Sequence, residues 1–71
     1  MNRQAGIDKA YALYIEACAA EGRARGAFDA ICEFGGPLAD RSRMFLEYEA
    51  ASAARATARR AVLAAYQVPN D

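Results

Sequence analysis

The side chains that most often carry enzyme chemistry are scarce in this sequence. The chain of 71 residues contains no histidine, which is the usual general base, proton shuttle and imidazole metal ligand at neutral pH. Its two cysteines, Cys18 and Cys32, lack the close spacing that structural zinc sites take. We therefore expect a protein that is not an enzyme, with no metal, cofactor or small-molecule substrate.

The cysteines also indicate the compartment. On one continuous helix, Cys18 and Cys32 would lie about 21 Å apart along the axis, too far for a disulfide bond between them. Free, packed thiols are typical of a reducing compartment. No apolar run approaches the roughly 20 residues that span a bilayer, and the N-terminus lacks the pattern of a signal peptide. We expect a complete cytoplasmic protein with no membrane partner.

Tyrosine and arginine are the residues best suited to recognition, because both are enriched at binding hot spots. Three of the tyrosines would gather at the end remote from a central turn, beside the C-terminal half of the second helix. Between Ala50 and Gln67 its only charges are three arginines. The candidate protein-binding residues are Tyr11, Tyr14, Arg55, Arg59, Arg60, Leu63 and Tyr66. Two alternatives stay open: the tyrosines thicken a seam built from alanine, and the arginines are neutralised by Glu16 and the helix dipole.

Two alanine-dense segments must position these residues, and Gly35-Gly36-Pro37 separates them. Glycine tolerates the left-handed conformation that ends a helix, and proline fits the first turn of the next. The sequence predicts one domain over residues 1–71, with a helix over about 7–34, a turn at 35–37 and a helix over about 38–67. This is an all-α antiparallel two-helix hairpin.

Apolar residues recur at alternating steps of three and four in both segments, which is typical of a packed helix face. The predicted contact faces are Ala10, Leu13, Ala17, Ala20, Ala24, Ala27, Ile31 and Phe34 in the first helix, and Met44, Ala51, Ala54, Ala58, Ala61, Ala65 and Val68 in the second. Tyr14 and Phe28 widen the first face, and Phe45, Tyr48 and Val62 flank the second. Folding the chain about residue 36 would then bring Glu16 near Arg55 and Asp29 near Arg43. Gly22 and Gly26 leave a kink or break at residues 21–26 open.

Several large side chains fall outside these contact faces, and a chain this short needs additional buried surface. A homodimer that forms a four-helix bundle would supply it. The candidate dimer-interface residues are Ile15, Cys18, Gly22, Leu46 and Leu63.

These features favour a small non-enzymatic regulator, inhibitor or adaptor that binds an unidentified protein, of the kind that phages and plasmids encode to modulate a host. The first alternative is a helical dimer that binds RNA or DNA through an arginine face. Nine basic and nine acidic side chains cancel, which argues against a general polyanion binder. The second alternative is a structural assembly subunit whose only activity is oligomerisation.

Overall fold

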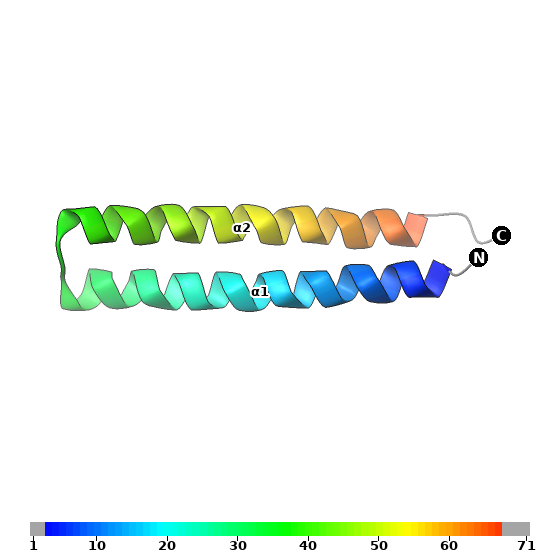
Figure 1. The fold of residues 1–71 in the computed structure, drawn as a ribbon, viewed down its shortest axis with the longest axis horizontal. Coiled ribbons are helices and arrows are strands. Elements are labelled where there is room, and N and C mark those ends of the chain that lie inside the picture. The colour runs from blue at the N-terminus through cyan, green and yellow to red at the C-terminus, as the bar shows by residue number, and fades with distance from the viewer. Residues whose placement is uncertain (1–2, 68–71) are drawn as a thin grey trace.

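The protein is a helical hairpin, as the sequence predicted (Figure 1). The structure, a computed structural model, describes residues 3–67. Helix α1 spans Arg3–Phe34 and helix α2 spans Leu38–Gln67. They run antiparallel, side by side along their whole length, so the molecule is a rod of 55 × 13 × 12 Å.

The turn at residues 35–37 depends on both glycines. Gly35 has φ of 85° and donates its N–H to the carbonyl of Ile31 at 2.9 Å, which closes the end of α1. At Gly36, with φ of 159°, a Cβ atom would lie 2.9 Å from Cγ1 of Ile31. The carbonyl of Pro37 then accepts the N–H groups of Asp40 and Arg41, both at 3.1 Å. Proline therefore caps α2, and Asp40 lies in its first turn.

Helix α1 is uninterrupted through residues 21–26, where the sequence had left a kink or break open. It also begins at Arg3, one turn before the expected start at Ile7. Within this first turn, Gln4 donates a hydrogen bond to the carboxylate of Asp8 at 2.8 Å. The helix starts earlier than predicted because Arg3 and Ile7 both pack against the end of α2, as their low exposure shows.

The contact face of each helix differs from the predicted one at every second position. The least exposed α1 residues include Ile7, Ala10, Tyr14, Ala17, Glu21, Ala24, Phe28 and Ile31, and those of α2 include Met44, Tyr48, Ala51, Arg55, Ala58, Val62 and Ala65. Half of the prediction is confirmed, because Ala10, Ala17, Ala24 and Ile31 are shared. Leu13 and Phe34, predicted to be in contact, are 52% and 81% exposed. The larger side chains that were predicted to flank these faces, such as Tyr14, Phe28, Tyr48 and Val62, fill the interface instead. Val68 lies outside the described residues.

The hairpin has little core of its own. Within residues 3–67, only Ile7, Ala10 and Val62 are buried, all near the end where the two termini lie (Figure 1). The remaining contact residues are half-buried. Two parallel rods can cover each other on one side only, so most of each helix surface faces outward.

Candidate functional site

Within residues 3–67, Glu21 and Arg55 form the only ion pair that joins the two helices. Oε1 of Glu21 lies 3.0 Å from Nε of Arg55. Their side chains are 22% and 32% exposed, whereas the side chains of the two other ion pairs are 47% to 69% exposed. Glu21 and Arg55 each occupy a contact position of their helix, so the pair lies in the interface itself.

Two hydroxyl groups complete this polar layer. A hydrogen bond from the Ser52 hydroxyl, followed by one from Arg55, lowers the pKa of Glu21 from its usual 4.5. The hydrogen bond with Glu21 raises the pKa of Arg55, and Tyr14 adds a weaker contribution of the same sign. Glu21 and Arg55 are therefore fixed in their charged forms by partners on both helices.

The charge pairs predicted from the fold about residue 36 are not the pairs that form. Arg55 contacts Glu21 and not Glu16, a difference of more than one helical turn. Asp29 pairs with Arg25 at 3.7 Å, and Arg43 pairs with Asp40 at 3.7 Å, both within one helix. The exposed charges therefore pair within their own helices, and the ion pair that crosses the interface is the half-buried one.

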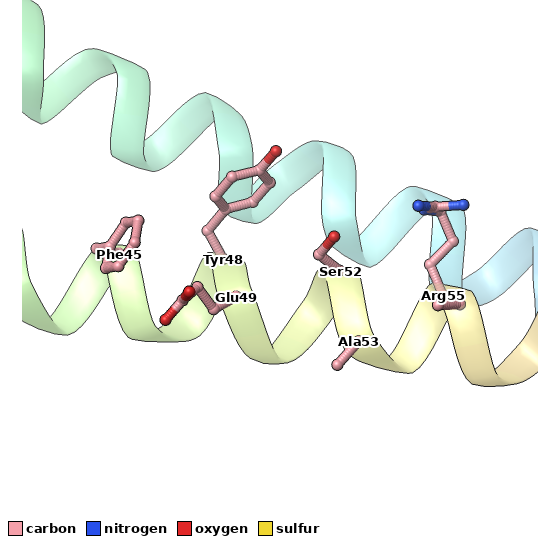
Figure 2. Close-up of a pocket in the computed structure, with 7 residues that line it drawn as sticks. Phe45, Tyr48, Glu49, Ser52, Ala53 and Arg55 are labelled. Carbon is pink, nitrogen blue, oxygen red and sulfur yellow. The ribbon is translucent and has the colours of Figure 1, made fainter.

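Aromatic rings form the next layers towards the turn. The ring centroid of Phe28 lies 5.5 Å from that of Phe45 and 6.3 Å from that of Tyr48, on which it stacks. A groove of about 430 Å³ runs beside these rings along α2 and ends at Ser52 and Arg55 (Figure 2). In Figure 2, Tyr48, Ser52 and Arg55 point towards α1, so their polar atoms serve the hairpin contact.

A second aromatic contact marks the end where the termini lie. The rings of Tyr11 and Tyr66 meet edge to face with centroids 6.3 Å apart, and a hydrogen bond with Tyr11 raises the pKa of Tyr66. Nη2 of Arg3 donates to the carbonyl of Tyr66, so a cation satisfies one of the free carbonyls at the end of α2. Ile15 lies one turn from Tyr11, and Leu63 and Arg59 lie on the same side of α2 as Tyr66.

We name this surface, formed by Tyr11, Ile15, Arg59, Leu63 and Tyr66, the tyrosine face. All five side chains are exposed. Comparison with protein-family models, with curated proteins and with solved structures finds no match to this chain.

The candidate protein-binding residues separate into two groups. Tyr11, Leu63 and Tyr66 are brought together on the tyrosine face with Arg59, and Arg60 lies beside them, where it donates to the Thr57 hydroxyl at 3.1 Å. Tyr14 and Arg55 instead lie half-buried in the interface. Their polar groups are engaged within the hairpin, so these two residues lie beneath the tyrosine face and are not part of it.

The candidate dimer-interface residues do not lie on a separate surface. Helical phase places Ile15, Cys18, Gly22 and Leu63 on the same side of the hairpin as Tyr11 and Tyr66. Leu46 lies on the outward side of α2 and is exposed. The residues selected for dimerisation and those selected for a partner therefore overlap.

Neither helix of the described residues has an apolar stretch that would cross a membrane. Over residues 3–67, no three His, Cys, Asp or Glu side chains gather into a group that could hold a metal ion. Cys18 is half-buried and Cys32 exposed, both as free thiols.

Sequence reasoning missed three functional side chains in the interface: Arg3, Glu21 and Ser52. A signal for one of them was available. Glu21 is the single acidic member of its row on α1, as Arg55 is the single basic member of its row on α2. Arg3 gave no such signal, because its role depends on where α2 ends.

Proposed function

We propose that the protein is a small non-enzymatic regulator or adaptor that acts, as a homodimer, by binding another protein through the tyrosine face. The observation that carries the proposal is the gathering of exposed Tyr11, Ile15, Leu63 and Tyr66 at one end of the rod, where they lie outside the small core of Ile7, Ala10 and Val62. Exposed apolar patches of this kind mark interaction sites.

The chemistry of the tyrosine face supports a protein partner. The edge-to-face contact of Tyr11 and Tyr66 holds both rings in place, so little side-chain entropy is lost on binding. Arg59 at the border adds a donor of the type enriched at binding hot spots. An apolar centre with a cationic border fits a partner segment that presents apolar side chains beside a carboxylate.

The nucleic-acid alternative receives less support. Arg55 is engaged by Glu21, which leaves Arg59 and Arg60 as the exposed arginines in that half of α2. Phosphate binding needs several uncompensated cations along one surface. A reducing, cytoplasmic setting belongs to the proposal because Cys32 is an exposed free thiol.

Capture from extracts of the source organism tests the proposal. The wild-type chain and a Tyr11→Ala/Tyr66→Ala variant are immobilised in parallel, with Leu38→Ala as the control because Leu38 is equally apolar and exposed at the turn. We expect the wild type and the Leu38→Ala variant to retain one unrelated protein that the double variant loses. Circular dichroism checks that all three chains are helical.

Two results would contradict the proposal. Recovery of this chain alone would favour a structural subunit. Retention of nucleic acid, weakened steeply by salt and by Arg59→Glu, would favour the nucleic-acid alternative.

A further inference from the structure

The side of the hairpin opposite the tyrosine face is rich in alanine and uncovered. By helical phase it also carries Glu47, which lies in the row of Ala54 and Ala61. We name it the alanine face and define it by Leu13, Ala20, Ala27 and Phe34 of α1 with Ala54 and Ala61 of α2. All are exposed except Ala20, which is half-buried. A groove of about 480 Å³ runs along α1 on this face, lined by Leu13, Glu16, Ala17, Ala19, Ala20 and Arg23.

The surface area of the chain indicates how much is left uncovered. The accessible surface is 5187 Å² for a chain of 7.6 kDa, whereas a folded monomer of that mass exposes about 4,300 Å². The excess, about 900 Å², is close to the roughly 800 Å² that each partner contributes to a standard protein interface. Covering one side of the rod would therefore bury an area about equal to this excess.

We propose that a second copy of this chain covers the alanine face. The two α1 helices cross antiparallel at a two-fold axis beside Ala20, and the two α2 helices do so beside Ala54. This inference rests on the homodimer of the proposed function and specifies its interface. Small side chains at the axis let the helix backbones approach closely.

Side-chain size is complementary about this axis. Leu13 and Ala27 are equally distant from Ala20 in the sequence, as are Gly6 and Phe34. Antiparallel pairing therefore sets Leu13 of one copy opposite Ala27 of the other, and the exposed ring of Phe34 opposite Gly6. A Cβ atom at Gly6 would meet nothing within 4 Å in the single hairpin, so the space there is open to a partner side chain.

On α1, charge is complementary about the same axis, whereas on α2 the axis sets Glu47 of one copy opposite Ala61 of the other. Glu16 and Arg23 border the groove on α1, and antiparallel pairing sets Glu16 of each copy near Arg23 of the other. The other two-fold arrangement, with α1 lying over α2 of the second copy, would set Glu16 near Thr57 and Arg23 near Ala50. Only the arrangement with α1 against α1 gives both charged groups a partner, and that favours it.

This interface leaves the tyrosine face open in both copies. Because the hairpins are antiparallel to each other, their two tyrosine faces lie at opposite ends of the bundle. One dimer then presents two identical binding surfaces.

Cysteine cross-linking tests the position of the axis. In a full-length background with Cys18→Ala and Cys32→Ala, we expect Ala20→Cys and Ala54→Cys each to form a disulfide-linked dimer under mild oxidation, because the two copies of each residue face each other. Ile15→Cys, on the tyrosine face, is the matched control and should stay monomeric on a denaturing gel. Cross-linking of Ile15→Cys alone would overturn the interface and leave the homodimer standing.

Charge exchange tests the pairing without a bulky substitution. Glu16→Arg and Arg23→Glu should each raise the dimer dissociation constant about tenfold or more by juxtaposing like charges, and the Glu16→Arg/Arg23→Glu double variant should return within about threefold of the wild type. Sedimentation equilibrium measures the constant, and circular dichroism verifies the helices. Single variants that dimerise like the wild type would overturn the pairing, and a monomeric wild type would overturn the homodimer too. Partner capture by the tyrosine face would be unaffected in either case.

Discussion

Glu21 and Arg55 face each other across the hairpin interface, with Oε1 and Nε 3.0 Å apart. Each is flanked in its row by alanines and, seven residues away on either side, by large apolar or aromatic side chains: Tyr14 and Phe28 on α1, Tyr48 and Val62 on α2. One polar layer within an apolar interface can pair in only one alignment, and a shift by one turn would oppose each charge to an apolar side chain. The ion pair therefore specifies the register of the hairpin.

The stability of the hairpin should fall in acid through Glu21. Its folded-state pKa is lowered from 4.5 by the Ser52 hydroxyl and by Arg55, so its contribution is complete above 4.5. The contribution decreases as the pH falls from 4.5 through the lower folded-state value. We expect the urea midpoint of the wild type to exceed that of Glu21→Gln at neutral pH, and the difference to vanish in strong acid.

The control for this titration is Glu33→Gln, because Glu33 is an exposed carboxylate of the same helix. At neutral pH its midpoint should match that of the wild type, because Glu33 lies outside the contact face. All chains are compared at one concentration, since dimer formation adds to the apparent stability. A constant difference between the wild type and Glu21→Gln down to strong acid would show that ionisation of Glu21 does not contribute.

Replacing both members of the ion pair should differ from replacing one. Glu21→Leu or Arg55→Leu alone leaves a half-buried charge without its partner, so each should lower the melting temperature. The Glu21→Leu/Arg55→Leu double variant should melt at or above the wild-type temperature, because leucine fits the apolar rows on either side. Calorimetry measures all three. Breaking the exposed Arg25–Asp29 pair, with Asp29→Leu, is the control and should change the melting temperature little.

The turn and the hairpin were predictable because glycines followed by a proline favour the end of one helix and the start of the next. The contact face was not, because alanine occupies two helical phases in both segments. A search for apolar residues selects Ala20 over Glu21 and Ala54 over Arg55. In the structure, the other face of each helix packs in the interface, because that face carries the side chains with the most apolar area to bury. They are Ile7, Tyr14, Phe28, Tyr48 and Val62. The surface placed inside the hairpin by that search is the alanine face.

The close alanine contacts should not tolerate larger side chains. The register set by Glu21 and Arg55 places Ala58 opposite Ala17, and both are half-buried. We expect Ala58→Leu to lower the free energy of unfolding by about 1 to 3 kcal/mol. Ala53→Leu, on the exposed side of α2, should change it by no more than about 0.5 kcal/mol. Urea denaturation followed by circular dichroism measures both, and a neutral Ala58→Leu would mean that the helices are not closely packed there.

The glycines of the turn and of the helix should respond oppositely to alanine. Gly35 has φ of 85°, so Gly35→Ala should cost about 1 to 2 kcal/mol. Gly26 lies within α1, where a Cβ atom meets nothing within 4 Å. Gly26→Ala should therefore stabilise the protein by up to about 1 kcal/mol through helix propensity. Thermal unfolding separates the two; a destabilising Gly26→Ala would reveal a close contact at that position.

The tyrosine face should be detectable by alkaline titration. The hydrogen bond with Tyr11 raises the pKa of Tyr66 from 10.0, so the neutral phenol contributes stability that is complete below 10.0 and is lost as the pH rises through the folded-state pKa. We expect Tyr11→Phe to move the highest-pKa component of the tyrosinate absorbance down towards 10.0. Tyr48→Phe is the matched control, because Tyr48 stacks on Phe28 at the other end of the rod and its loss should leave that component unchanged. An unshifted component in Tyr11→Phe would show that the two hydroxyls are not paired in solution, and the rings would then be free to separate when a partner binds.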